Sequence, residues 1–118
     1  MTRVKFCGIT SLGDAQLCAE HGAWALGMIF VPSSPRRCRP ADAAQIAQAM
    51  KRKVQLVGVF QNAKLDHVVG TAESLDLTVV QLHGDEGPSY CGEVARRTGA
   101  KVMKAARVRT RADVVALE

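Results

Sequence analysis

Strand-like and helix-like segments alternate along this 118-residue sequence. The strand-like runs are Val4–Cys7, Ala25–Phe30, Val54–Phe60, Thr78–His83 and Lys101–Ala105. Segments with helical periodicity lie between them, near Leu12–His21, Ala41–Lys51, Leu65–Ser74 and Ser89–Thr98. Strands separated by helices, in repeats of about 20 to 30 residues, indicate βαβ units with right-handed crossovers. The pattern therefore predicts an α/β fold with a parallel sheet, in one domain over residues 1–118.

Local signals support the predicted helix boundaries. Ser11 and Asp14 have the spacing of a helix N-cap pair, and Gly22 is placed to end the same helix. Pro40 stands at the entry of the second helix, where its missing N–H costs nothing, and Gly99 follows the fourth. A further helix start is expected at residues 110–113.

The composition restricts the class of protein. Hydrophobic residues make up 47% of the chain with few aromatics, so the core should be aliphatic. No run of about 18 apolar residues is present, which argues against a membrane span. Met1-Thr2-Arg3 leads directly into a strand, so we expect no secretion. The cysteines form no CxxC pair and are interpreted as reduced thiols of a cytoplasmic protein: Cys7, Cys18, Cys38 and Cys91.

Three interpretations of the formal charge of +5 can be weighed. Solvated helix ends and loops are the first interpretation of the basic residues. An anionic small-molecule substrate is the second. A nucleic-acid partner is not expected, because the basic groups are scattered and no aromatic platform lies among them.

Polar side chains on two strands indicate where a site would lie. Side chains alternate across a strand, so Lys5 and Cys7 share one face of the first strand. Gln81 and His83 share one face of the fourth. A parallel strand covered by helices on both faces should be apolar throughout. The polar face predicts a barrel interior that opens into a site at the carboxyl ends of the strands.

Each candidate residue has an alternative interpretation. Cys7 is either a nucleophile or base, or a buried inert thiol. His83 is either a site residue or a hydrogen-bonded structural histidine. Arg36, in a loop stiffened by prolines, either clamps a carboxylate through two hydrogen bonds or is solvated. Cys38 lies between two arginines, which predicts an exposed thiol with a favoured thiolate form.

Four motifs in order resemble the phosphoribosylanthranilate isomerase family of tryptophan biosynthesis. They are Lys5–Thr10, Ala25–Phe30 followed by Ser34-Pro35-Arg36, Val57–Phe60, and Val80–Glu86. The resemblance covers essentially the whole chain. It implies a (βα)8 barrel, of which this chain would form the first five βα units, with parallel strands in sequential order.

The resemblance also implies a reaction and its residues. The family carries out an Amadori rearrangement of N-(5-phosphoribosyl)anthranilate to 1-(2-carboxyphenylamino)-1-deoxyribulose 5-phosphate, without cofactor or metal. Cys7 would be the general base. Arg36 would bind the anthranilate carboxylate, and Gln81 and His83 would line the substrate pocket. The positive charge suits a substrate that carries phosphate and carboxylate.

The chain departs from the family by ending after the fifth predicted strand. The family's general acid, an aspartate, follows the sixth strand, and the phosphate site follows the seventh and eighth. We therefore expect an incomplete barrel that is inactive alone. Its open strand edges would favour self-association, or complementation by a C-terminal barrel half.

A complete flavodoxin-like binding or signalling module is the alternative, because five βα units fit this length. Strand order separates the two predictions: 2-1-3-4-5 favours the flavodoxin-like fold, and 1-2-3-4-5 favours the barrel.

Overall fold

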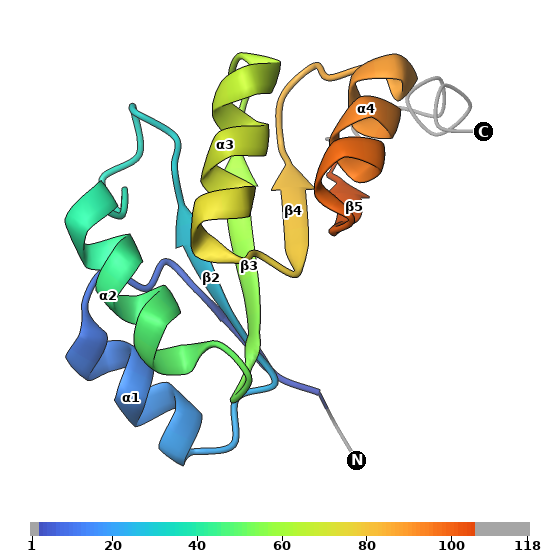
Figure 1. Ribbon diagram of the computed structural model, residues 1–118. Helices are drawn as coiled ribbons and strands as arrows, with labels where there is room; N and C mark the ends of the chain where they lie inside the picture. The colour runs from blue at the N-terminus through green and yellow to red at the C-terminus, as the bar shows by residue number, and fades with distance from the viewer. Residues whose placement is uncertain (1–2, 106–118) are drawn as a thin grey trace, which may run out of the picture.

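The computed structural model describes residues 3–105, and the helix expected from residue 110 lies outside this range. Strands and helices alternate throughout, as predicted (Figure 1). The strands are β1 (Lys5–Cys7), β2 (Ala25–Ile29), β3 (Gln55–Phe60), β4 (Val79–Leu82) and β5 (Lys101–Lys104). The helices are α1 (Leu12–Glu20), α2 (Pro40–Met50), α3 (Leu65–Leu75) and α4 (Pro88–Thr98). None of these described helices is long and apolar enough to cross a membrane.

The predicted helix boundaries are confirmed at their capping residues. The Ser11 hydroxyl accepts a hydrogen bond from the Asp14 N–H at 3.2 Å and caps α1. Pro40 is the first residue of α2. Gly99 ends α4 in the left-handed conformation, with φ +70°. Ser11 thus gives a partner to an N–H group at the start of α1, and the N–H of Gly99 gives one to the carbonyl of Ala95 at the end of α4, whereas Pro40 has no N–H that would need a partner.

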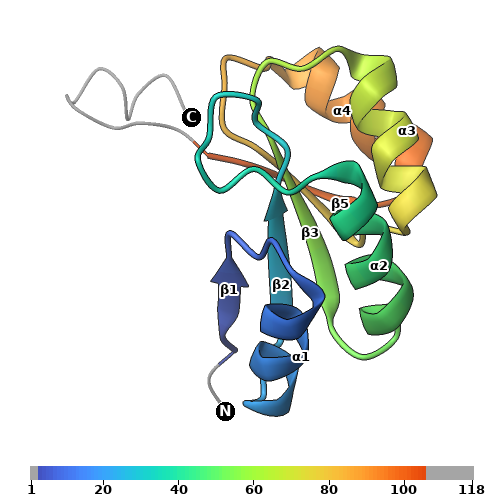
Figure 2. The same cartoon turned by 90° about the vertical axis from the view of Figure 1, so that its left-hand side faces the viewer.

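The sheet has the order β1-β2-β3-β4-β5, and all neighbouring strands pair in parallel. In Figure 2 the arrows of β1 and β2 run side by side in the same direction. This order excludes the 2-1-3-4-5 arrangement of the flavodoxin-like alternative. Sequential order combined with right-handed crossovers places every helix on the same face of the sheet.

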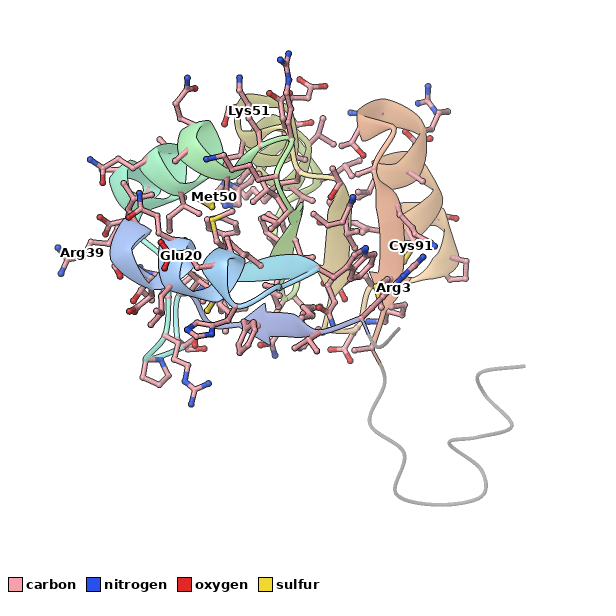
Figure 3. The ribbon with its side chains drawn as sticks, turned by 90° about the horizontal axis from the view of Figure 1, so that it is seen from below. Arg3, Glu20, Arg39, Met50, Lys51 and Cys91 are labelled. Atoms are coloured by element: carbon pink, nitrogen blue, oxygen red, sulfur yellow. The ribbon has the colours of Figure 1, made fainter. Side chains whose placement is uncertain are left out.

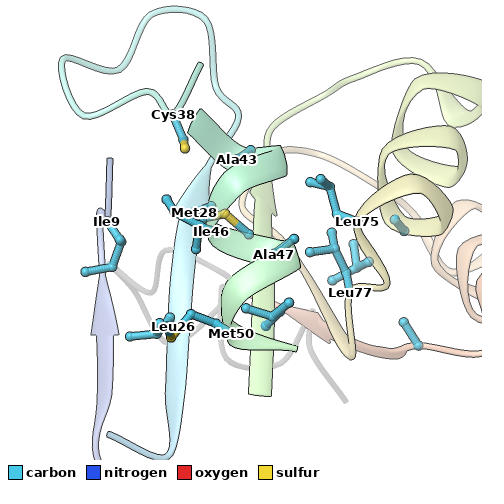
Figure 4. Close-up of a cluster of buried hydrophobic side chains, with 14 of the residues drawn as sticks. Ile9, Leu26, Met28, Cys38, Ala43, Ile46, Ala47, Met50, Leu75 and Leu77 are labelled. Carbon is cyan, nitrogen blue, oxygen red and sulfur yellow. The ribbon is translucent and has the colours of Figure 1, made fainter. Parts of the chain in front are cut away.

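That face carries the main hydrophobic core. Each described helix contacts the next one along the chain, and Figure 2 shows the helices together on one side of the strands. Leu26 and Met28 of β2 face Ile46 and Met50 of α2 (Figure 4). The ring of Phe60, which is fully buried, stacks on Phe30 with centroids 5.3 Å apart. The core is mainly aliphatic, as the composition predicted.

The opposite face is concave and partly polar. Ala25, Val57 and Val79 form a small buried cluster on it, separate from the main core. Lys5 of β1 donates a hydrogen bond to Oε1 of Gln81 on β4 at 2.5 Å. In a flat sheet these strands would lie about 14 Å apart, with side chains perpendicular to the sheet. The bond therefore requires the sheet to curl towards this face, as the wall of a barrel does.

Candidate active site

The predicted site residues all lie at the carboxyl end of the sheet or on its concave face. Cys7 is the last residue of β1, and Arg36 is in the loop after β2. Gln81 lies within β4, and His83 follows the last residue of that strand. In a parallel α/β protein, ligands bind at this end because the variable loops converge there.

Two glycines make room around Cys7. Cys7 pairs with Gly27 of β2, and a Cβ on Gly27 would lie 3.1 Å from the Cys7 sulfur. Gly8 has φ +87°, a conformation that turns the chain sharply after β1. The N–H groups of Gly8 and Ile9 both donate to the carbonyl of Gly27, each at 3.0 Å. The Cys7 side chain is exposed, so it is not the buried inert thiol of the alternative interpretation.

The loop after β2 brings Arg36 to the same place. The N–H of Cys38 donates to the carbonyl of Ile29 at 2.8 Å, and the N–H of Arg36 donates to the Ser34 hydroxyl at 3.2 Å. The first bond holds the loop against the end of β2, and the second lies within the loop. A Cβ on Gly8 would lie 2.9 Å from Cδ of Arg36. The Arg36 side chain therefore packs over the residue that follows Cys7.

His83 stands at the end of β4 and is exposed to solvent. The backbone N–H of His83 donates to the carbonyl of Phe60 at 2.9 Å, which extends the β3–β4 pairing by one residue. Partial burial and the positive charge of Lys5, with a smaller contribution from Lys104, lower the pKa of the imidazole below 6.5, while Glu86 opposes the shift. At neutral pH the ring is therefore mostly uncharged, and suited to hydrogen bonding a polar group rather than to attracting an anion.

The structure adds residues to which the sequence analysis gave no role. Lys5 extends its ammonium group from β1, the strand of Cys7, to the Gln81 side chain of β4. Alternation along β1 already put Lys5 on this face, but its partner 76 residues away could not be read from the sequence. Glu86 has a nearly fully buried side chain in the loop after His83. Its partners also come from distant segments.

The prediction for Cys38 is wrong. The sequence analysis expected an exposed thiol activated by Arg37 and Arg39, but the residue is only 1% exposed. Burial, together with the negative charge of Asp42, raises the pKa of its thiol to about 11. The chain turns back to pair with β2 at this point, so the Cys38 side chain enters the core next to α2 (Figure 4).

A well-formed hollow lies elsewhere on the described residues. It has a volume of about 680 Å³ and opens between α1 and α2, where Glu20, Met50 and Lys53 line it. Figure 3 looks at this end of the molecule and labels Glu20 and Met50. It lies towards the amino ends of the strands, away from Cys7. We place the candidate site on the concave face nonetheless. β1 and β5 are the outer strands of the described sheet and leave that face unenclosed, so a site on it would not form a closed hollow.

The groups at the carboxyl end form a consistent chemical set. They are an exposed thiol, a guanidinium group, a neutral imidazole, an amide and an ammonium group. Such a set can transfer a proton and bind an anionic substrate. Within residues 3–105, no group of three or more His, Cys, Asp and Glu side chains is placed to hold a metal ion.

Comparison with known proteins identifies the family of this chain. The family of N-(5'-phosphoribosyl)anthranilate (PRA) isomerases matches residues 4–117. This chain belongs to that family. It is 51% identical over 117 residues to the N-(5'-phosphoribosyl)anthranilate isomerase of Citrifermentans bemidjiense, covering 99% of this chain and 55% of that protein.

Solved isomerases of this family share the fold. The enzyme from Thermotoga maritima superposes with a TM-score of 0.91 at 39% identity, covering 99% of this chain and 56% of that one. A second isomerase, solved with reduced 1-(o-carboxyphenylamino)-1-deoxyribulose 5-phosphate, gives the same TM-score and identity and covers 99% and 59%. The chain thus spans a little over half the length of the relatives it matches.

Proposed function

We propose that this chain supplies the amino-terminal part of an active site that isomerises N-(5'-phosphoribosyl)anthranilate, a step of tryptophan biosynthesis. The observation that carries the proposal is the exposed Cys7 thiol at the end of β1, with the Arg36 side chain packed beside it over Gly8. A related isomerase binds a reduced form of the corresponding deoxyribulose phosphate.

In the proposed reaction Cys7 is the general base. Once the ribose ring has opened, the substrate is an imine with a protonated nitrogen. The Cys7 thiolate takes the proton from C2, and the electrons of that C–H bond form a C1=C2 double bond while the imine electrons return to nitrogen. The resulting enol becomes the C2 ketone as its hydroxyl at C2 loses a proton and C1 gains one. The product has the same atoms as the substrate, and no electrons leave it.

Arg36, Gln81 and His83 bind the substrate in this proposal. The planar guanidinium of Arg36 can donate two parallel hydrogen bonds to the anthranilate carboxylate. The neutral imidazole of His83 and the amide of Gln81 suit the ribose hydroxyls. Lys5 holds the Gln81 side chain through the 2.5 Å hydrogen bond.

We also propose that these 118 residues have negligible activity alone. Cys7 and Arg36 lie on a concave face that the described strands do not enclose, and the acid that protonates the ring oxygen lies outside this chain in our proposal. The outer strands β1 and β5 would then associate with a C-terminal barrel half or with a second copy. Exposed Phe6 and Met103 at these strands favour such association. Four free thiols favour a cytoplasmic location.

The test is reconstitution. The chain is mixed with the carboxyl-terminal part of the Citrifermentans bemidjiense isomerase that it does not match, and turnover of N-(5'-phosphoribosyl)anthranilate is followed. We expect turnover from the mixture and negligible turnover from either piece. The matched control repeats the mixture with the Arg36→Ala chain, for which KM should rise. Full turnover by the chain alone, or none by a mixture that forms a stable complex, would count against the proposal.

A further inference from the structure

A buried carboxylate lies directly behind the candidate site. The Glu86 side chain is 1% exposed and belongs to the loop that follows His83. Ionised carboxylates are rarely buried this completely unless they are paired and hydrogen-bonded. The proposed reaction does not use Glu86, so its burial calls for another explanation.

Glu86 joins three segments at the ends of different strands. Its Oε2 accepts a hydrogen bond from the N–H of Asn62, after β3, at 2.8 Å. Its Oε1 accepts from the N–H of Gly84, after β4, at 2.9 Å. The same oxygen pairs with the ammonium of Lys104, the last residue of β5, at 2.8 Å. Lys104 also donates to the carbonyl of Gly84, so both backbone groups of that residue are held.

A second set of contacts locks the two loops together. The side-chain carbonyl of Asn62 accepts a hydrogen bond from the N–H of Asp85 at 2.7 Å. Asn62 itself adopts the left-handed conformation, with φ +50°. A Cβ on Gly84 would lie 2.4 Å from Oδ1 of Asn62, so residue 84 has no room for a side chain. The backbone immediately after His83 is therefore fixed from two sides.

The charge on Glu86 belongs to this arrangement. Burial alone would raise the pKa of the carboxyl, but the hydrogen bonds from Lys104 and from backbone N–H groups outweigh burial and hold the pKa below 4.5. The carboxylate is thus ionised at neutral pH. Hydrogen bonds to an ionised acceptor are about twice as strong as neutral ones, so they constrain the geometry more tightly.

We propose that Glu86 is a positioning residue: by tying the ends of β3, β4 and β5 together, it fixes the backbone after His83 and so holds the imidazole at the mouth of the site. It acts through His83 and touches no substrate. The role of His83 in binding rests on the proposed function, whereas the positioning itself does not.

The first experiment measures positioning by NMR on the 118-residue chain. Glu86→Gln replaces one accepting oxygen with a donor and removes the charge. We expect the Asn62 and Gly84 amide protons to exchange about 10- to 100-fold faster, as loss of a charge-assisted hydrogen bond implies, and the His83 ring signals to move. The matched control is Glu93→Gln, which removes an exposed carboxylate paired only with surface arginines on α4. It should leave all these signals unchanged.

A second variant tests the proposal in case Glu86→Gln does not fold. Lys104→Met keeps both N–H bonds to Glu86 but removes the link to β5. If Glu86→Gln does not fold, we expect Lys104→Met to move the His83 ring signals and to speed exchange at Gly84. The proposal is overturned if a folded variant melts at a lower temperature yet leaves the His83 ring signals and both amides as in the wild type, because Glu86 would then be only structural.

The second experiment uses the reconstituted isomerase. If Glu86 acts through His83, Glu86→Gln should raise KM in the wild type but not in a His83→Ala background. Equal, additive effects in both backgrounds would contradict positioning. If the wild-type mixture has no activity, the proposed function fails, while the NMR measurement still decides the role of Glu86.

Discussion

Gly8→Ala should disturb the candidate site. It should lower the stability of the fold no more than Gly22→Ala does. Gly8 and Gly22 both adopt left-handed backbone conformations, with φ +87° and +82°. A Cβ on Gly22 meets nothing within 4 Å, whereas a Cβ on Gly8 lies 2.9 Å from Cδ of Arg36. Gly8→Ala and Gly22→Ala therefore share one backbone cost and differ in their effect on Arg36.

The magnitudes follow from this difference. Alanine in the left-handed conformation costs about 1–2 kcal/mol, which corresponds to a loss of about 4–8 °C in Tm for a chain of this size. In Gly8→Ala, Arg36 must also move by roughly 0.5 Å to restore ordinary van der Waals contact. The Arg36 side chain is exposed and flexible, so this shift adds little to the stability cost. It displaces the guanidinium group, which should raise KM for the anthranilate substrate about 10-fold.

Two assays check this prediction. Urea unfolding of each variant should give losses of unfolding free energy that agree within about 0.5 kcal/mol, as expected for one shared mechanism. Steady-state kinetics of the reconstituted isomerase should show a raised KM for Gly8→Ala alone. A Gly22→Ala chain as stable as the wild type would refute the backbone reasoning. An unchanged KM for Gly8→Ala would refute the placement of Arg36.

Three further predictions concern the core, the thiols and pH. Phe60→Ala should lower the free energy of unfolding by about 3–5 kcal/mol because the ring is fully buried. Leu17→Ala, at a position 54% exposed, should change it by less than about 0.5 kcal/mol. Equal losses in urea unfolding would contradict the described core. Alkylation at pH 8 followed by mass mapping should label exposed Cys7 well before Cys38, whose thiol has a pKa of about 11 and is buried; early labelling of Cys38 would show that it is not buried. The pKa of Glu86 is below 4.5 in the folded chain, so its contribution to stability is present above that pH and is lost as pH falls through the folded pKa; Glu86→Gln should accordingly flatten the acid side of a plot of stability against pH.

Much of the fold could be predicted from the sequence because its signals are local. The alternating periodicity placed every described strand and helix within a few residues of its observed ends. Ser11, Pro40 and Gly99 marked helix ends through their own backbone chemistry. The polar face of β1 and β4 indicated a barrel-like curvature before any strand order was known.

The parts that could not be predicted depend on contacts between distant segments. Cys38 is buried because the loop returns to pair with β2, and the flanking arginines gave no sign of that path. Glu86 is ionised and buried because Asn62 and Lys104 converge on it from other strands. Asn62 and Lys104 lie 24 and 18 residues from Glu86, so no spacing within one segment encodes that arrangement.

The central claim is that Cys7 is the base of a sugar-phosphate isomerase site, and one kinetic measurement tests it most directly. Turnover of N-(5'-phosphoribosyl)anthranilate is compared between the reconstituted wild type and Cys7→Ala under saturating substrate. Loss of a general base predicts a fall in kcat of about 10²- to 10⁴-fold with little change in substrate binding. A Cys7→Ala enzyme with the kcat of the wild type would contradict the account.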